Sequence, residues 1–144
     1  MYVGWLPDVY PTADTAETAL KRQDLFVCEE EGNVLASAII NQCQVDVYEE
    51  GDWTYCGSEE EVMVLHTLAV NPNATRRGLG SAFVKFYEEY AIQKGCSVLR
   101  MDTNEQNTIA RKLYRKLGYL EAGIVPCEFN GIPGVNLVLL EKKL

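Results

Sequence analysis

The sequence feature that most constrains the fold is the mostly apolar nine-residue run Val62–Val70. Side chains alternate between the two faces of a strand, and in this run both faces look buried. That pattern is typical of a central strand covered on both sides. A regular strand would place one set of alternate residues on a single face: Val62, Val64, His66, Leu68 and Val70.

A long helix is predicted soon after this strand. From Leu79 to Ala91 the apolar residues recur at intervals of three and four, as they do along one face of an amphipathic helix, and Lys94-Gly95 would end it. The remaining pattern predicts two more helices, from Thr12 to about Gln23 and from Asn107 to Leu117, and a hairpin turn at residues 30–33. It also predicts strands at Leu25–Cys28, Val34–Tyr48, Ser97–Met101, Tyr119–Val125 and Val135–Leu140. Strands with interleaved helices indicate a single α/β or α+β domain over residues 1–144, with a mixed sheet.

Composition narrows the classes of partner. A net charge of −8 argues against a nucleic-acid partner and is compatible with a cationic substrate, although acidity also serves solubility alone. No apolar run reaches the roughly 18 residues that span a bilayer, and the first residues lack a signal peptide, so we expect a cytoplasmic protein without a membrane partner. The cysteines are scattered and odd in number, so they suggest neither a disulfide framework nor a metal site: Cys28, Cys43, Cys56, Cys96 and Cys127.

The turn before the long helix contains the strongest local signal for a binding site. It reads Arg76-Arg77-Gly78-Leu79-Gly80-Ser81. Backbone N–H groups at a helix start have no partner within the helix, glycines admit a bulky group, and arginines add charge, so the turn predicts an anion cradle. The P-loop pattern needs a lysine that is absent, and the dinucleotide pattern needs a third glycine. A glycine-rich helix start with solvated arginines is the simpler alternative.

Three ordered segments together resemble the GNAT superfamily of N-acetyltransferases. They are residues 65–72, which include the end of the predicted strand and the two residues after it, the turn at residues 76–81, and the stretch at residues 107–119 that contains Lys112-Leu113-Tyr114. The resemblance implies a mostly antiparallel sheet flanked by helices. It also implies that the middle strands, at 62–70 and 97–101, splay apart to hold acetyl-CoA. If these strands do not diverge, the cofactor assignment fails.

The resemblance also implies the residues that hold acetyl-CoA, with no metal. Backbone groups of Leu68, Ala69 and Val70 would pair with the pantetheine arm, and Asn107 would contact that arm. The phosphates would lie against Arg76, Arg77, Gly78, Leu79, Gly80 and Ser81. Thr75 departs from the Gln or Arg that the family usually has at the first position of this loop.

The implied chemistry is direct transfer of the acetyl group to a primary amine, such as a small metabolite, a polyamine or amino-acid derivative, or a peptide N-terminus. A backbone N–H near Leu68 would hold the oxyanion, and Tyr114 would protonate or stabilise the departing thiolate. His66 and Glu61 are the candidates for the base that deprotonates the amine, and a water chain without a dedicated base is the third possibility.

Two alternatives stay open at the level of the whole chain. Family members usually begin with a strand and a helix ahead of the segment that here starts at Trp5, and this front end is expected to be shortened. A partner subunit in a homodimer, or other packing, would then cover an exposed edge strand. The chain is either an acetyltransferase or a non-catalytic acyl-CoA-binding module. An acidic loop with Trp53 and Tyr55 is either solvated or a binding site for an ammonium group.

Overall fold

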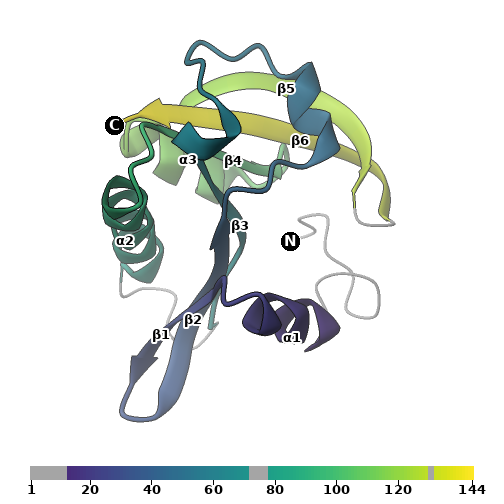
Figure 1. Cartoon of the computed structure of the whole chain (residues 1–144). Helices are drawn as coiled ribbons and strands as arrows, with labels where there is room; N and C mark the ends of the chain where they lie inside the picture. Colours follow the sequence, from purple (N-terminus) through teal and green to yellow (C-terminus); the bar gives the residue numbers. More distant parts are fainter. Residues whose placement is uncertain (1–12, 72–77, 130–131) are drawn as a thin grey trace.

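The computed structural model describes residues 13–71, 78–129 and 132–144. Its six strands form one sheet in the order β1-β2-β3-β4-β6-β5, with the β1–β2 hairpin at one end and the long, curved β5–β6 pair at the other (Figure 1). Only β3 and β4 are parallel neighbours; all other pairs are antiparallel. The elements are α1 Ala13–Lys21, β1 Leu25–Glu30, β2 Asn33–Asn41, η1 Asp46–Glu50, η2 Glu59–Glu61, β3 Val62–Val70, α2 Leu79–Gln93, β4 Val98–Asn104, α3 Thr108–Lys116, β5 Leu120–Phe129 and β6 Ile132–Lys143.

The β1–β2 hairpin confirms the predicted turn, but β2 is shorter than expected. The two turn residues, Glu31 and Gly32, have φ values of 52° and 80°, as a tight two-residue hairpin requires. The strand predicted to run to Tyr48 ends at Asn41, and a 3-10 helix follows at Asp46–Glu50. Tyr48 is still buried, so the apolar residues around it in the sequence reflect packing against the core and not a strand.

Two hydrophobic clusters cover the two faces of the sheet. On the helical face, α2 and α3 pack over strand residues that include Met63, Leu65, Leu99 and Met101. On the opposite face, here called the loop face, Tyr48 and Trp53 pack over Val62, Val64, Val98 and Leu139. β3 is therefore buried on both sides at its start, as the apolar run predicted, and the start of β4 is buried in the same way.

The expected alternation along β3 breaks in its second half. Between the pairs Ser37–Ala69 and Ile39–His66, two residues of β3, Thr67 and Leu68, lie opposite one residue of β2. This is a β-bulge, and it shifts the facing of every later residue by one. Leu68 and Val70 pack against the helical-face cluster, whereas Val62 and Val64 lie on the loop face. The prediction that all four share a face is therefore wrong.

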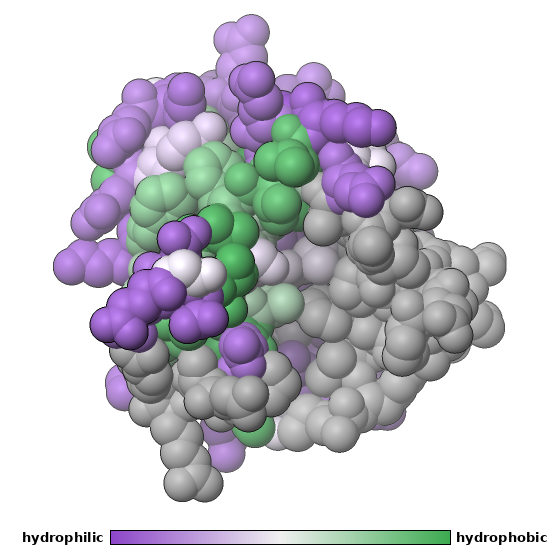
Figure 2. Space-filling view, turned by 90° about the horizontal axis from the view of Figure 1, so that it is seen from below, coloured by the Kyte–Doolittle hydropathy of each residue, from purple (hydrophilic) through white to green (hydrophobic). Residues whose placement is uncertain are grey.

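The exposed surface is mixed in character. Figure 2 shows apolar surface bordered by polar residues on the face seen from below, and several large apolar side chains are exposed, among them Leu20, Val27, Val34 and Ile92. Scattered exposure of this kind is ordinary in a small domain. No helix in the described part of the chain is long and apolar enough to cross a membrane. The expectation of a shortened front end falls on residues 1–12, outside the described residues, and the homodimer stays a prediction.

Candidate active site

The central feature of the candidate site is a split in the sheet between β3 and β4. Their parallel pairing covers four residue pairs, from Val62–Val98 to Leu65–Met101, and then stops. β3 goes on pairing with β2 as far as Val70, and β4 goes on pairing with β6 as far as Asn104. The two strands therefore diverge, which confirms the expected splay. Beyond Leu65, the edge of β3 that faces β4 has no strand partner in the described part of the chain.

The bulge lies at the start of this split and is conformationally unusual. Thr67 has a φ of 51°, a region in which a β-branched residue is an outlier. Such outliers concentrate at functional sites, where the surrounding structure maintains them. The following residues, Leu68, Ala69 and Val70, are partly exposed. Their backbone groups on the open edge are positioned for a ligand that lies in the split like an added strand.

The start of α2 provides backbone N–H groups for an anion. Gly78 is the N-cap, with a φ of 69°, and no side chain caps the helix there. The first helical residues, Leu79, Gly80 and Ser81, are partly exposed. A Cβ atom on Gly80 would lie 3.2 Å from the Leu113 side chain, so the glycine lets α2 approach α3 closely. Arg76 and Arg77, predicted to complete the cradle, lie outside the described residues.

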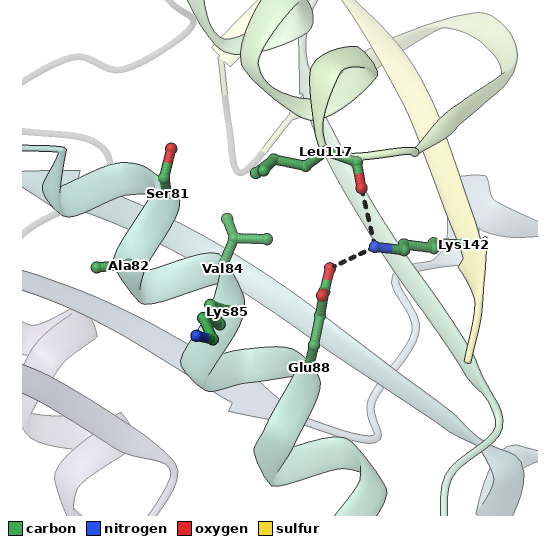
Figure 3. Close-up of a pocket in the computed structure, with 7 residues that line it drawn as sticks. All are labelled: Ser81, Ala82, Val84, Lys85, Glu88, Leu117 and Lys142. Carbon is green, nitrogen blue, oxygen red and sulfur yellow. Dashed lines mark hydrogen bonds and ion pairs between the residues drawn. The ribbon is translucent and has the colours of Figure 1, made fainter.

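A cavity of about 440 Å³ opens next to this helix start (Figure 3). Lys142 on its wall donates hydrogen bonds to Glu88 Oε2 at 3.1 Å and to the Leu117 carbonyl at 2.8 Å. These charged groups pair with each other, so they tie β6 to both helices. The remaining lining residues are Ser81, Ala82, Val84 and Lys85.

Tyr114 differs from the other fully or nearly buried tyrosines in what its hydroxyl contacts. Tyr48 donates to Asp102 at 2.6 Å, Tyr87 to the Met63 carbonyl at 2.6 Å, and Tyr119 to Glu88 at 2.8 Å. The Tyr114 hydroxyl makes no hydrogen bond to any described residue, although its side chain is only 6% exposed. Burial, with a smaller effect from the charge of Asp102, raises its pKa to about 12. A hydroxyl that no described residue binds is available to a ligand.

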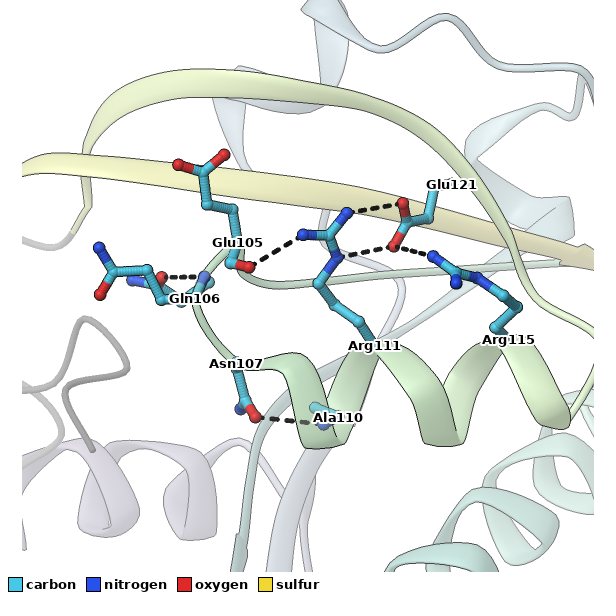
Figure 4. Close-up of polar contacts among 8 residues, drawn as sticks. Glu105, Gln106, Asn107, Ala110, Arg111, Arg115 and Glu121 are labelled. Carbon is cyan, nitrogen blue, oxygen red and sulfur yellow. Dashed lines mark hydrogen bonds and ion pairs between the residues drawn. The ribbon is translucent and has the colours of Figure 1, made fainter.

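Asn107 is the N-cap of α3, the helix that holds Tyr114. Its Oδ1 accepts a hydrogen bond from the Ala110 N–H at 3.1 Å, and no described residue accepts from its Nδ2 (Figure 4). Arg111 makes two bonds of 2.9 Å to the Glu121 carboxylate and one to the Glu105 carbonyl. These contacts fix α3 against β5, and so they fix where Tyr114 lies.

His66 lies at the split, but its ring is held by neighbours. Its Nε2 is 2.8 Å from Asn41 Oδ1, an atom that can only accept, so the ring donates there. Asn41 in turn donates to Asp24 at 2.8 Å. Burial is the largest influence on the ring and lowers its pKa to about 4. His66 is therefore neutral at pH 7 and a weak base.

Glu61 is not brought to the split. It precedes Val62, at the end of β3 where that strand and β4 are still paired. Its carboxylate accepts hydrogen bonds from the backbone and hydroxyl of Ser58 and caps the short helix η2, and these bonds lower its pKa. The expectation that Glu61 lies at the mouth of the site is corrected: the carboxylate has a structural contact at the far end of the strand.

The loop around Trp53 is partly exposed, with Asp52, Thr54 and Cys56 at the surface, but the face of the Trp53 ring is already occupied by a cation. Arg100 already lies over the Trp53 ring, 4.2 Å from its centroid. The backbone N–H groups of Thr54 and Tyr55 both donate to the buried Glu141 carboxylate at 2.7 Å. The loop is thus anchored onto β4 and β6, and the cation that its aromatic ring attracts is one of the protein's own side chains.

The sequence reasoning missed Asp102, which stands at the split. It is the first residue of β4 after the last pair with β3, as His66 is the first on β3. Tyr48 donates to Asp102 Oδ2 at 2.6 Å, and burial raises the pKa of this carboxyl to about 6. The signal was present in the alternation of Val98, Arg100 and Asp102, which places polar groups on one face just where an apolar strand ends.

The described residues fit an extended acyl-CoA and show no metal site. No group of three or more His, Cys, Asp or Glu residues among them could hold a metal ion. The split offers an open strand edge, α2 offers an uncapped N-terminus, and the Tyr114 hydroxyl has no described partner. These three features are the ones that a thioester on a phosphorylated arm needs for pairing, charge and leaving-group stabilisation.

Comparisons with known proteins agree with this geometry. An uncharacterized N-acetyltransferase of Methanocaldococcus jannaschii is 27% identical over 108 residues, which is 74% of this chain and 44% of that protein. An uncharacterized N-acetyltransferase of Bacillus subtilis is 34% identical over 64 residues, 44% of this chain and 43% of that protein. The chain thus matches less than half the length of these curated relatives.

Solved structures share the fold at low sequence identity. Ard1 of Thermoplasma volcanium superposes with a TM-score of 0.73 at 14% identity, covering 94% of this chain and 81% of that one. YncA of Salmonella typhimurium, solved with its cofactor acetyl-CoA, gives a TM-score of 0.62 at 21% identity over 83% of this chain and 64% of that one. The sequence pattern of the Acetyltransferase (GNAT) family matches residues 2–119. The chain belongs to the GNAT family of acetyltransferases.

Proposed function

We propose that this protein transfers the acetyl group of acetyl-CoA directly to a primary amine. The observation that supports this most is the unpartnered Tyr114 hydroxyl beside the β3–β4 split, the only such hydroxyl among the four buried tyrosines of the described residues. A non-catalytic module would need the split to bind the acyl-CoA but would have no use for a hydroxyl beside it that no described residue binds. The leading account is therefore an enzyme.

The arm of acetyl-CoA would lie in the split. Backbone groups of Leu68, Ala69 and Val70 on the open edge of β3 would pair with its amides, and Asn107 Nδ2 would contact the arm from α3. The phosphates would lie at the N–H groups of Gly78, Leu79, Gly80 and Ser81, with Arg76 and Arg77 nearby in sequence. The structure of YncA with acetyl-CoA supports a cosubstrate of this kind in this fold.

The pKa of Tyr114 refines its role. A thiol has an ordinary pKa of about 8.5, so full proton transfer from a phenol of pKa about 12 to the departing thiolate is uphill by roughly 5 kcal/mol. A hydrogen bond from the neutral phenol is not subject to this penalty. We infer that Tyr114 donates a hydrogen bond to the leaving sulfur and stays protonated, while the thiolate takes its proton from solvent.

The amine is not restricted further by this geometry. Among the relatives, the aminoglycoside N(6')-acetyltransferase type 1 of Salmonella typhimurium is 30% identical over 60 residues, 42% of this chain and 41% of that protein, and its name gives an aminoglycoside as acceptor. The net charge of −8 is compatible with a cationic acceptor here. A panel should therefore include aminoglycosides, polyamines, amino-acid derivatives and short peptides.

The test is mass-spectrometric detection of acetylated products from this panel, with Tyr114→Phe as the diagnostic variant. We expect one class of amine to be acetylated, and Tyr114→Phe to lower the turnover by roughly 10²-fold, in the range measured for the loss of one transition-state hydrogen-bond donor. Tyr90→Phe, the same chemical change near the far end of α2, serves as control and should leave turnover unchanged. Binding of acetyl-CoA without acetylation of any amine would favour the non-catalytic module.

A further inference from the structure

The carboxylate of Asp102 has no ion-pair partner among the described residues, whereas three other partly or fully buried acidic groups have one. Asp24 pairs with Arg22, Glu88 with Lys142, and Glu121 with Arg111. No ion pair between described residues includes Asp102, and the hydrogen bond that it accepts from a described residue comes from the Tyr48 hydroxyl to Oδ2. No described residue donates to its second oxygen. A carboxylate in a protein wall is costly without a partner, so one that lacks a partner is a candidate to meet a cation from outside.

Asp102 lies where a cation from outside could reach it, on the loop face at the border of the split. Side chains at Val98 and Asp102 share the loop face of β4, because Val98 belongs to the loop-face cluster and Tyr48 of that cluster reaches Asp102. Asp102 follows the last parallel pair, Leu65–Met101, so it borders the split. Tyr114 packs in the cluster of the opposite, helical face. A group that enters from the loop face meets Asp102, and a group that leaves on the helical face meets Tyr114.

We propose that Asp102 accepts the proton that the substrate's ammonium group loses before its nitrogen attacks, with Tyr48 as the residue that positions the carboxylate. The proposal rests on the amine acetylation proposed above. It replaces His66, whose Nε2 proton is donated to Asn41, and Glu61, which caps a helix at the far end of β3. Neither Asp102 nor Tyr48 was among the predicted site residues.

The titration behaviour of the neighbourhood is consistent with this role. With a pKa of about 6, Asp102 is mostly ionised at pH 7 and is a stronger base than an ordinary aspartate. The titratable groups that face it are Tyr48 from η1, Tyr114 from α3 and Cys127 from β5, all neutral at pH 7, and burial, followed by the negative charge of Asp102, raises their pKa values further. His66, neutral as well, is its counterpart on β3, and Arg100 on β4 is bound to Gln44 and the Tyr55 carbonyl.

The proton and bond balance is complete without a further reagent. The ammonium gives one proton to the Asp102 carboxylate and becomes a neutral amine. Its lone pair forms a C–N bond with the thioester carbonyl carbon, the C–S bond breaks, and the electron pair leaves with sulfur as thiolate. The nitrogen loses its second proton, the thiolate gains one, and the Asp102 proton passes to solvent. The products are the amide, the free thiol and one released proton.

The experiment compares wild type with Asp102→Asn, Tyr48→Phe and Asp46→Asn, using the acetylated amine and measuring kcat/KM between about pH 5 and 10. Asp46 is exposed on the same 3-10 helix as Tyr48, so its change to Asn is the matched control and should have no effect. Calorimetric affinity for acetyl-CoA and circular dichroism establish that each variant folds and binds the cosubstrate.

We expect Asp102→Asn to lower kcat/KM about 10²-fold or more at neutral pH, the scale of a lost general base, without weakening acetyl-CoA binding. The deficit should shrink as pH rises toward the pKa of the amine, because free amine then needs no base. In wild type the acid limb should lie near pH 6. The Tyr48 hydrogen bond lowers the pKa of Asp102, so Tyr48→Phe should move this limb to higher pH.

Two results would overturn the proposal itself: a deficit below tenfold for Asp102→Asn, or a deficit that stays constant as pH rises, which would indicate a structural role only. If Asp102→Asn does not fold, an unmoved acid limb in Tyr48→Phe overturns it. A wild-type protein that binds acetyl-CoA and acetylates no amine contradicts the proposed function, and the assignment of Asp102 falls with it.

Discussion

Two titratable residues on the loop face, His66 and Asp102, have pKa values displaced in opposite directions by the same cause. Burial disfavours the charged form of each, so it lowers the pKa of the imidazole to about 4 and raises that of the carboxyl to about 6. Both residues border the split, where the sheet no longer covers them with a paired strand. The residue-scale consequence is a measurable dependence of stability on pH.

Asp102→Asn should make the protein more stable at pH 7 to 8. The folded state holds the Asp102 proton more tightly than the unfolded state, whose ordinary pKa is 3.8, so the free energy of unfolding falls as pH rises from about 4 to 6. Above that range the ionised group destabilises the fold by up to about 3 kcal/mol. The variant escapes this penalty and keeps an acceptor for Tyr48. Urea denaturation at pH 4 and pH 7.5 checks it, and Asp46→Asn is the control.

The same measurement exposes the contribution of His66. Its folded pKa of about 4 lies below the ordinary 6.5, so stability is present above 6.5 and is lost as pH falls toward 4. In wild type this slope opposes that of Asp102 within the shared range. In Asp102→Asn the opposing slope is gone and the His66 slope remains, so the stability of the variant should rise with pH between about 4 and 6.5. A variant that is less stable than wild type at pH 7.5 would contradict the account.

Residue types predicted some of these roles and not others. Tyr114 was predicted from a motif, and only the packed structure reveals that its hydroxyl, unlike those of the other buried tyrosines, is bound by no described residue. Asp102 was missed because the predicted strand ended at Met101, and a carboxylate past the end of a strand reads as loop. Trp53 was assigned two possible roles, and the sequence offered no sign that Arg100, 47 positions later, would take its ring.

At the scale of elements, α2 has glycines with positive φ at both ends, and only one of them lies at the candidate site. Gly78 has a φ of 69° and Gly95 a φ of 79°, and a Cβ atom on either would meet nothing within 4 Å. Changing either residue to alanine should therefore lower the free energy of unfolding by about 1 to 2 kcal/mol, through backbone strain alone.

Acetyl-CoA affinity should separate these two variants. Strain at the N-cap displaces the first N–H groups of α2, which are the proposed phosphate donors, whereas strain at Gly95 acts at the opposite end of the helix. We expect Gly78→Ala to bind acetyl-CoA several-fold more weakly, and Gly95→Ala to bind it as wild type does. Calorimetric titration of both measures this. Equal affinities in the two variants would exclude the start of α2 from the binding site.

The elements themselves were largely predictable where local chemistry decides them. The period of α2, the hairpin turn at Glu31-Gly32 and the N-cap of α3 were all present in the sequence. The end of β2 and the bulge in β3 were not, because both depend on contacts between strands. Thr67 and Leu68 look regular in sequence, and only pairing with β2 shows two residues opposite one.

At the scale of the whole molecule, the sheet consists of two antiparallel halves, β1-β2-β3 and β4-β6-β5. Four residue pairs between β3 and β4 join them. Chain order follows the same division, since β1 to β3 precede α2 and β4 to β6 follow it. The split at the far side of this junction is the proposed place of the acetyl-CoA arm.

Hydrogen exchange should detect the arm in that place. Residues 62–65 of β3 lie between β2 and β4, whereas residues 66–70 have only β2 as a neighbouring strand. Acetyl-CoA should slow the exchange of amides in 66–70, because its own amides would bond to the open edge, and should leave the already protected 62–65 unchanged. β6, paired on both sides, is the internal control. Protection that is absent from 66–70 would place the cosubstrate elsewhere.

The short junction between the halves has a mechanical consequence. Two halves of a sheet that are joined by only a short pairing can rotate about it. A small rotation at the β3–β4 junction then becomes a larger displacement at the open ends of the strands. The side chains packed at this junction, Val62, Leu65, Val98 and Met101, are buried. Their volumes set the distance between the two halves of the sheet, so the width of the split that is available to an acyl chain is determined at the β3–β4 junction.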